Sequence, residues 1–437
     1  MKRVLLVAPH FPPLGAVDGN RARMLVSHLS AFGWEPSVLT VDAAVQPETT
    51  EAELLETLPR ELRVTRVGAI PLTLSRTVGI GNVALRALPQ LYRAGARAIR
   101  NDGIDLVYFS TTMFAALPLG RVWKRLFGVP YVIDMQDPWH SDLTPERSTI
   151  KTQAARVMHR VLERFTMRTV DGLVAVSPAY LETLRSRYPW IGPEVCRTIP
   201  FGAAIEDHHI AARRSWVNPF FRPGAGERHG VALGRGGDDM RTAAAILFRA
   251  WKAAAEGRAG SRPEHFWFVG TDYAPACNGR KTIEPVAAAE GLGGLVREQP
   301  ARIAYLDGLR LLGEADFLIV LGSTDAQYSP SKVYPYLLAG RPIVAVLHES
   351  SPVVDILKRA RTGPVVTFAD ASDVDAAAAR LVPQLLEWRD AVPASVPLDA
   401  SLHRTFSARV LAGAHGELFD RVTRMRETGV AVVPCQG

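Results

Sequence analysis

The chain has 437 residues, of which 47% are hydrophobic and 22% are charged. This length exceeds what one hydrophobic core usually supports, so we expect two domains, and the composition excludes a mainly disordered chain. The formal net charge is +7, and most of the excess positive charge falls in the first 200 residues. No run of 18 apolar residues occurs, which excludes a helix that spans a membrane.

The start of the chain predicts a strand rather than a leader sequence. Only five apolar residues, Val4 to Ala8, precede Pro9 and His10, which fits a buried strand and not a signal peptide. The three cysteines are far apart and lack the spacing of a zinc site or a redox pair. These features predict a cytoplasmic protein.

The first 200 residues alternate short apolar runs with helix-length amphipathic segments, which is typical of a doubly wound parallel sheet. The predicted strands are Val4–Ala8, Pro36–Val41, Leu62–Val67, Leu106–Phe109, Tyr131–Asp134, Leu173–Val176 and Val195–Ile199. The pattern stops at Pro200-Phe201-Gly202, and the polar stretch that follows indicates a linker.

The same alternation then resumes and predicts a second α/β domain. Its predicted strands are Gly230–Leu233, Phe266–Val269, Ile303–Tyr305, Phe317–Leu321, Ile343–Leu347 and Val365–Phe368. Helices are expected at 239–255 and 371–388, and a single amphipathic helix at 401–424. We therefore predict a first domain at 1–205, a linker at 206–228, a second domain at 229–398, and a C-terminal helix and tail at 399–437.

The loop after the first strand contains glycines and leads into a helix that begins near Arg21. Such a loop presents backbone N–H groups to an anion or to hydroxyl groups, although a plain turn is the alternative. Its spacing is not that of a dinucleotide fingerprint, which argues against a nicotinamide-dependent dehydrogenase.

Polar residues also follow two other strands of the first domain. Asp137, Trp139 and His140 come after Tyr131–Asp134, where a carboxylate could accept a proton or orient a hydroxyl group. Alternatively, Asp137 starts a turn and Trp139 covers the core. Thr111 and Thr112 could contact a sugar or cap a helix.

Two cationic segments stand out in the second domain. Ser329 is the predicted N-cap of a helix that ends before Gly340, and Lys332 adds a cation at its start. Phosphate binding is the expected use of such a helix end, and a structural helix with a surface lysine is the alternative. In the loop 234–237, Arg235 could hold a phosphate through two hydrogen bonds. We interpret Asp373-Val374-Asp375 as a helix cap and not as a metal site.

Several short motifs together resemble the family 4 glycosyltransferases of the GT-B fold, in the order in which that family has them. They are Pro9-His10-Phe11-Pro12-Pro13 with its glycine loop, Val174-Ala175-Val176-Ser177, Ile199-Pro200-Phe201-Gly202, Phe268-Val269-Gly270, and the helix from Ser329 to Gly340 followed by Arg341-Pro342.

The resemblance implies two Rossmann-like domains that face a cleft, with a C-terminal helix that crosses back to the first domain. It further implies a retaining, metal-independent transfer of a sugar from a nucleotide-diphosphate sugar to a polysaccharide, lipid-linked or small-molecule acceptor. The first domain would bind the acceptor and the second the donor. No cofactor is implied besides this donor substrate, and no nucleic-acid partner.

The resemblance also implies roles for particular residues. Asp137 would lie at the reacting centre, and Arg235 and Lys332 would stabilise the leaving diphosphate. The implied donor-binding residues are Gly15, Gly19, Gly234, Gly236, Ser329, Ser331, Lys332 and Glu349. The implied acceptor-binding residues are His10, Asp18, Asn20, Thr111, Thr112, Trp139 and His140.

The sequence departs from the family at its pair of glutamates, where Gln327 and Pro335 stand instead, and Glu349 is the nearby substitute that we consider. Two alternative functions follow, a nucleotide-sugar 2-epimerase of the same fold or a catalytically weakened nucleotide- or sugar-binding protein. A contact with an anionic membrane is a further expectation. It rests on basic and apolar residues of two segments, which are Arg76, Val83, Leu85, Arg86, Leu88, Leu91, Arg93, Arg97, Ile99 and Arg100 in one and 123–127 in the other.

Overall fold

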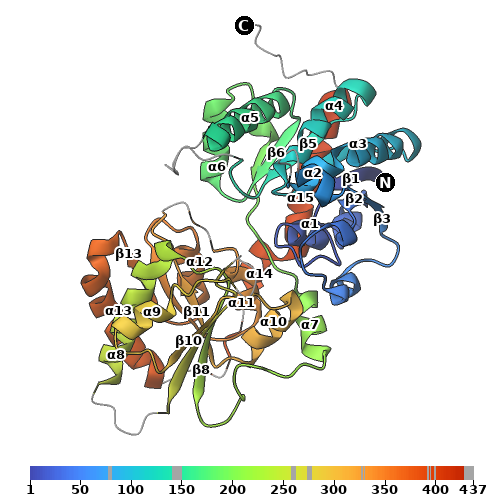
Figure 1. The fold of residues 1–437 in the computed structure, drawn as a ribbon. Helices are drawn as coiled ribbons and strands as arrows, with labels where there is room; N and C mark the ends of the chain where they lie inside the picture. The colour runs from blue at the N-terminus through green and yellow to red at the C-terminus, as the bar shows by residue number, and fades with distance from the viewer. Residues whose placement is uncertain are drawn as a thin grey trace. The chain divides into compact units, whose positions relative to one another are not determined.

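The computed structural model describes the chain except for residues 77–80, 140–149, 257–261, 273–277, 326–327, 329, 391–392, 394, 398–399 and 428–437. Two compact units make up the chain (Figure 1). The first unit contains Met1–Gly202 and Ser407–Gly437, and the second contains Ala203–Phe406. In the part of the chain that the structure describes, no helix is both long and apolar enough to cross a membrane.

The first unit is built on a parallel sheet of seven strands in the order β3-β2-β1-β4-β5-β6-β7. Its strands are β1 (Lys2–Val7), β2 (Trp34–Val41), β3 (Arg63–Val67), β4 (Leu106–Ser110), β5 (Tyr131–Met135), β6 (Gly172–Ala175) and β7 (Cys196–Thr198). The central strands are buried on both faces, which explains their continuous apolar sequence.

Helices cover both faces of this sheet. They are α1 (Gly19–Val26), α2 (Leu72–Arg76), α3 (Val83–Asn101), α4 (Pro118–Phe127), α5 (Ile150–Met167), α6 (Pro178–Arg187) and α15 (Ala408–Glu427). One face packs against apolar residues of α3, α4 and α6, and the other against α1 and α15. The first unit therefore has the doubly wound arrangement that the sequence predicts.

The second unit contains a parallel sheet of six strands in the order β10-β9-β8-β11-β12-β13. Its strands are β8 (Arg228–Leu233), β9 (Glu264–Val269), β10 (Val296–Gln299), β11 (Phe317–Leu321), β12 (Ile343–His348) and β13 (Val365–Phe368). Its helices are α7 (Ile205–Arg213), α8 (Arg241–Ala255), α9 (Glu284–Ala289), α10 (Tyr305–Glu314), α11 (Val333–Leu338), α12 (Val353–Ala360), α13 (Val374–Asp390) and α14 (Ala400–Phe406).

The chain also contains short 3-10 helices. They are η1 (Leu29–Phe32), η2 (Ala43–Val45), η3 (Ala52–Thr57), η4 (Phe114–Ala116), η5 (Pro193–Val195), η6 (Asp238–Met240) and η7 (Ala371–Asp373).

The second unit differs from the expectations at two places. The strand expected at 303–305 is instead the entry to α10, and the strand lies at Val296–Gln299. This edge strand alternates buried and exposed residues, so it lacks the apolar run by which the other strands were predicted. The expected linker at 206–228 begins with α7, whose Asp207 accepts a hydrogen bond of 2.9 Å from the Tyr305 hydroxyl of α10.

The C-terminal helix is divided in two. Instead of one helix at 401–424, α14 ends at Phe406 and α15 begins at Ala408. The Ser407 hydroxyl accepts a hydrogen bond from the N–H of Val410, which caps the start of α15. Leu418, Phe419 and Val422 of α15 are buried in the core of the first unit, so the predicted return to that unit is confirmed.

Candidate functional site

In the first unit, polar side chains gather at the carboxyl edge of the sheet. Asp18 lies between β1 and α1, Thr111 and Thr112 follow β4, and Gln136 follows β5. Because β1, β4 and β5 are neighbours in the sheet, these loops meet at one edge. Ligands of open parallel sheets bind at this edge, so it is the candidate site of the first unit.

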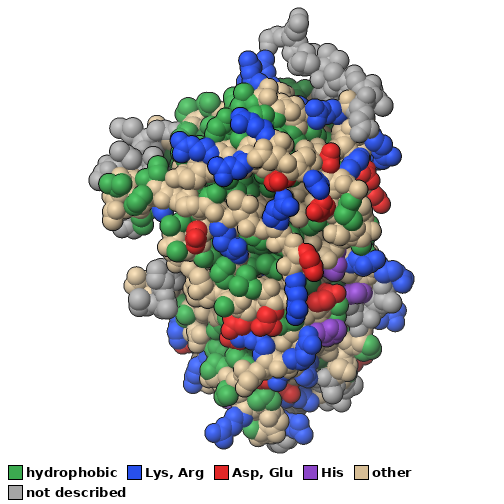
Figure 2. Space-filling view, turned by 90° about the vertical axis from the view of Figure 1, so that its right-hand side faces the viewer, with side chains coloured by type: hydrophobic (Ala, Val, Ile, Leu, Met, Phe, Trp, Pro, Cys, Tyr) green, Lys and Arg blue, Asp and Glu red, His purple; other side chains and the backbone are tan. Residues whose placement is uncertain are grey.

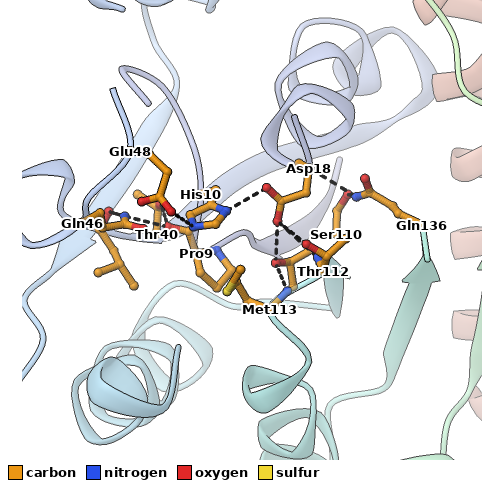
Figure 3. Close-up of polar contacts among 12 residues, drawn as sticks. Pro9, His10, Asp18, Thr40, Gln46, Glu48, Ser110, Thr112, Met113 and Gln136 are labelled. Atoms are coloured by element: carbon orange, nitrogen blue, oxygen red, sulfur yellow. Dashed lines mark hydrogen bonds and ion pairs between the residues drawn. The ribbon is translucent and has the colours of Figure 1, made fainter. Parts of the chain in front are cut away.

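The carboxylate of Asp18 is the centre of this group (Figure 3). Its Oδ1 lies 2.8 Å from Nδ1 of His10, and its Oδ2 accepts hydrogen bonds from the Thr111 hydroxyl at 3.2 Å and from the Thr112 hydroxyl at 3.1 Å. The backbone N–H of Thr112 donates a further bond of 3.2 Å to Oδ2. Both oxygens of Asp18 are thus occupied, which explains why this N-cap residue does not cap α1 with its side chain.

His10 lies between two carboxylates. Its Nε2 is 3.7 Å from Oε1 of Glu48, opposite the contact with Asp18. Burial disfavours the imidazolium, but the hydrogen bond to Asp18 and the charges of Asp18 and Glu48 together raise the pKa of His10. For Asp18, the bonds from His10 and Thr112 outweigh burial and lower the pKa. His10 and Asp18 are therefore a buried, hydrogen-bonded pair that fixes the loop after β1.

The two glycines of this loop serve local structure. A Cβ atom on Gly19 would lie 2.8 Å from the carbonyl oxygen of His10, so only glycine allows α1 to start this close to the loop. The N–H of Gly15 donates to the carbonyl oxygen of Thr49 at 3.0 Å, and that of Gly19 donates to Ala16 at 3.2 Å. Neither N–H is available to a phosphate in this arrangement, which favours the interpretation of the loop as a structural turn.

The remaining expected residues of the first unit differ in their surroundings. The exposed Asp137 is partly desolvated by the protein around it and lies in the field of Asp18, and both effects raise its pKa. Trp139 is buried, stacks on Phe114 with ring centroids 5.3 Å apart, and donates its N–H to His159. This placement favours packing for Trp139.

The side chain of Asn20 faces its own helix, because its Oδ1 accepts a bond of 3.4 Å from Nε of Arg23. His140 lies outside the described residues.

A buried ion pair beside this site was missed by sequence reasoning. Nε of Arg21 lies 2.9 Å from Oδ2 of Asp134, and both side chains are buried. The Arg21 guanidinium also donates to the carbonyl oxygens of Ile199 and Pro200, at 2.7 and 2.9 Å. Asp134 accepts a further bond from the Ser110 hydroxyl. The pair therefore ties α1 to β5 and to the end of the first unit's main segment.

In the second unit, the loop 234–237 follows β8 at the corresponding edge of its sheet. The N–H groups of Gly234 and Gly236 each donate to a carbonyl oxygen, of Val269 and Thr271, at 2.8 Å. The N–H of Gly237 donates to the Thr282 hydroxyl at 3.0 Å. These three N–H groups are satisfied within the protein, so the loop is fixed in place.

The cation of this loop, Arg235, is held by a second residue that sequence reasoning missed. Its guanidinium binds both carboxylate oxygens of Asp239, at 3.1 and 2.6 Å, and lies over the ring of Tyr328 at 4.8 Å. Asp239 in turn accepts a bond of 2.5 Å from the Ser323 hydroxyl after β11. Asp239 stands four residues after Arg235, which is the only sequence signal for this pair.

Lys332 lines a cavity of about 50 Å³ together with the loop 234–236. Its amine packs against Gly234, where φ is +127° and any Cβ atom would collide with the lysine side chain. Burial, and then the charges of Arg302 and Arg235, lower the pKa of Lys332 to about 7. No carboxylate of the described residues forms an ion pair with this amine. Arg235 and Lys332 thus line the same cavity, and the exposed Arg302 lies near enough for its charge to act on Lys332, an arrangement that is suited to a multiply charged anion.

The helix that follows Lys332 is shorter than expected. Instead of starting at Pro330, α11 begins at Val333, with Lys332 as its N-cap, and has six residues. Gly340 has φ of +65°, which confirms the predicted stop. The side chains rather than the helix dipole therefore carry the charge of this site.

The other expected donor residues lie apart from the cavity. Ser331 and the exposed Glu349 do not line it, and Pro335 occupies the first turn of α11. Ser329 and Gln327 fall outside the residues that the structure describes.

Glu298 is a further positioning residue that the sequence did not reveal. It is buried at the end of β10 and accepts bonds from the Thr271 hydroxyl and from the N–H groups of Thr282, Ile283 and Glu284, at 2.7 to 3.1 Å. Thr271 and Thr282 also accept hydrogen bonds from the N–H groups of Gly236 and Gly237. Glu298 therefore holds in place the two residues that bind this loop.

The two aspartates of the Asp373-Val374-Asp375 segment, which resembles a metal-binding motif, each form an ion pair with an arginine. Asp373 pairs with Arg380 at 2.9 Å, and Asp375 pairs with Arg249. Among the residues that the structure describes, no three His, Cys, Asp or Glu side chains are grouped as metal ligands would be.

A comparison with family models finds a match within the first unit, and this match ends where the first segment of that unit ends. Residues 19–202 match the family model of the glycosyl transferase 4-like domain. No curated protein matches the chain.

Three solved structures resemble nearly the whole chain. Sucrose-phosphate synthase from Thermosynechococcus elongatus is 16% identical, with a TM-score of 0.59, and the match covers 97% of this chain and 100% of that one. Anabaena HepE in complex with UDP and glucose is 13% identical (TM-score 0.56; 99% and 100% covered). A glycosyltransferase from Rickettsia africae is also 13% identical (TM-score 0.55; 96% and 98% covered).

These structural likenesses rest on the two parallel sheets and their helices. At such low identity they establish the fold and not the substrates. The chain therefore has the two-domain α/β fold named GT-B, and the match of residues 19–202 to the glycosyl transferase 4-like domain confirms its resemblance to the family 4 glycosyltransferases.

Proposed function

We propose that this protein transfers a sugar from a nucleotide-diphosphate sugar to a hydroxyl group of an acceptor. The observation that carries the proposal is that Arg235 and Lys332 line one cavity of the second unit, with the charge of Arg302 acting on Lys332 as well. A diphosphate gains negative charge as the bond to the sugar breaks, and preorganised cations stabilise that charge. The second unit would thus bind the donor.

The donor is proposed to carry a uridine nucleotide. HepE, which shares the fold, was solved with UDP and with UDP-glucose. The satisfied N–H groups of the loop 234–237 leave the diphosphate to the side chains of Arg235 and Lys332. Because these cations supply the neutralising charge, we propose that no metal ion is required, and the resemblance to family 4 favours retention of configuration.

The first unit is proposed to bind the acceptor. Asp18 is engaged within the protein, because its Oδ2 accepts three hydrogen bonds and its Oδ1 contacts Nδ1 of His10. Its part is to hold His10, Thr111 and Thr112 in place. Asp137 has the exposure and the raised pKa that suit a group which orients or exchanges a proton with the acceptor hydroxyl. We place the reaction in the cytoplasm, where nucleotide sugars are the available donors.

The test combines binding with turnover. A native-state ligand at a hundred times its Kd raises the free energy of unfolding by about 2.7 kcal/mol, so UDP is expected to raise the Tm, and ATP is the comparison. UDP release from UDP-glucose, and from a panel of other UDP-sugars, is then measured with EDTA present, with and without a panel of glycosyl acceptors. Acceptor-dependent release supports the proposal. Turnover without any acceptor would favour the 2-epimerase.

A weakened binding protein is the second candidate, and Pro335 favours it. The family has a glutamate where this chain has proline in the first turn of α11, so a contact to the nucleotide is missing. The expected results differ, because such a protein would show the rise in Tm with UDP but no turnover of any donor in the panel.

Donor affinity is expected to depend on pH through Lys332. The pKa of about 7 belongs to the free protein, and a bound diphosphate would raise it, so binding takes up a proton above pH 7. The Kd for UDP-glucose should therefore stay constant below pH 7 and rise up to about tenfold per pH unit above it. Calorimetry between pH 6 and pH 9 measures this, and Lys332→Arg should flatten the profile. A flat profile for the unmodified protein would contradict the assignment.

A further inference from the structure

The structure corrects which residues of the first unit are able to meet a membrane. Val83, Leu91 and Ile99 of α3 were expected at such a surface, but they are at most 9% exposed and belong to the core. Trp123 of α4 is fully buried as well. The apolar side of α3 therefore packs on the sheet. Of the arginines expected at the membrane, Arg86 is buried and donates to the carbonyl oxygens of Ile70 and Val45, whereas Arg93, Arg97 and Arg100 are exposed.

An exposed apolar stripe lies instead on α5. Val157 and Val161 are 59% and 61% exposed, and Met158 and Phe165 are 43% and 39% exposed. Positions 157, 158, 161 and 165 fall within about a quarter of the helix circumference, so these side chains form one continuous face. On the neighbouring α4, Leu126 is 55% exposed. Single exposed apolar residues are ordinary, but an aligned set marks an interaction site.

Arg121 joins the two helices. Its guanidinium lies over the ring of Phe165 at 4.3 Å and donates to the carbonyl oxygen of that residue at 2.8 Å. The apolar stripe of α5 and the outer side of α4 thus form one surface, which we call the α4–α5 face and define by Arg121, Arg125, Leu126, Val157, Met158, Val161, Arg164 and Phe165.

Basic residues outnumber acidic ones on the helices of the α4–α5 face and on the adjacent α3. The helices α3 and α4 contain no acidic residue, and the one in α5, Glu163, is buried and bonded to Arg187 and Tyr188. The exposed Arg125 and Arg164 form no ion pair with any residue that the structure describes. Arg93 and Arg97 on the adjacent α3 are exposed too. Figure 2, which views the first unit from the side of α3 and not of α5, shows Lys and Arg side chains beside hydrophobic ones in its upper part.

We propose that the α4–α5 face docks on an anionic lipid bilayer. Unpaired arginines would bind the lipid headgroups, and the Val157, Val161 and Leu126 side chains would enter the boundary between headgroups and acyl chains. A polyanion such as RNA would use the arginines but would gain nothing from the aliphatic stripe. The combination therefore favours a bilayer, and the acceptor site of the same unit would then be held near lipid-linked acceptors.

The test is flotation of the full chain with vesicles of phosphatidylcholine alone or with 30% phosphatidylglycerol. Binding is expected only to the anionic vesicles. Val157→Glu with Val161→Glu should weaken it by at least about tenfold, because two exposed apolar side chains lose their contact. Arg125→Ala with Arg164→Ala should weaken it by about 30-fold, because each basic residue near an anionic surface contributes about fivefold.

Matched controls come from the second unit. Val217 is 86% exposed and Lys358 is an exposed residue of α12, so Val217→Glu and Lys358→Ala should bind vesicles like the unmodified protein. All variants change exposed side chains, and an unchanged Tm verifies their folding. Vesicle binding that survives the double valine variant would overturn the proposal, as would a failure of the unmodified protein to float. Tighter binding to poly(A) RNA, insensitive to the valines, would assign the face to a polyanion.

Discussion

Replacing Lys332 by methionine is expected to lower kcat for sugar transfer by about 10²- to 10³-fold, the usual effect of removing one charge-stabilising group from an active site. The same substitution should raise the free energy of unfolding. At pH 7 and below, the folded protein binds the Lys332 proton more weakly than the unfolded chain does, because the pKa falls from its ordinary value of 10.5 to about 7. Keeping Lys332 charged in the folded protein therefore costs free energy, about a few kcal/mol, and methionine removes this cost.

Measuring turnover and Tm together distinguishes a residue that binds the donor from one that only supports the fold. Loss of turnover with a higher Tm is expected at pH 7, and the gain in Tm should shrink as the pH rises toward 10.5. Lys358→Met, at an exposed lysine of α12, is the control and should change neither quantity. A variant at Lys332 that unfolds more easily, or one that keeps full activity, would contradict the role of this lysine.

Replacing Arg21 by methionine is expected to destabilise the protein by about 3 to 5 kcal/mol, because the Asp134 carboxylate would remain buried without its partner. Both side chains are at most 5% exposed, and Arg21 also holds the carbonyl groups of Ile199 and Pro200. Urea unfolding with and without the substitution measures the change in free energy.

Two comparisons make this second prediction specific. Adding Asp134→Asn to the Arg21 variant should restore part of the stability, since an amide costs less to bury than a charge. Arg3 pairs with Glu35 at 3.0 Å on the surface, where both side chains are at least 50% exposed, so Arg3→Met should cost less than about 1 kcal/mol. Equal effects at Arg3 and Arg21 would show that burial does not set the strength of these pairs.

The parts of the fold that could be predicted from sequence are the strands and helices whose own residues show a clear apolar pattern. Val4 to Val7 are buried on both faces of a sheet, so an unbroken apolar run marks the strand. Val296–Gln299 lies at an edge with half its residues exposed, and no comparable run marks it. A similar limit applies to the break at Ser407, because the apolar spacing continues across it.

The grouping of polar residues in the first unit could be predicted from their positions in loops after neighbouring strands. His10, Asp18, Thr111 and Thr112 come together because their strands are neighbours, and strand order follows from the doubly wound pattern. Asp239, Glu298 and Asp134 could not be predicted, since each acts through a partner that only packing brings near. The use of the glycine N–H groups inside the loop 234–237 likewise depends on β9 and on the residues after it.

The return of α15 to the first unit has a consequence for biosynthesis. The second unit is one continuous segment that ends at Phe406, whereas the first unit is completed only by residues after it. During translation the inserted second unit can reach its native state first, while the sheet of the first unit waits with the surface for Leu418 and Phe419 uncovered. Lys2, at the other end of the chain, then bonds to the Thr423 hydroxyl at 2.8 Å. Segments from before and after the second unit thus close the same core, so the first unit cannot complete this core until α15 has been synthesised.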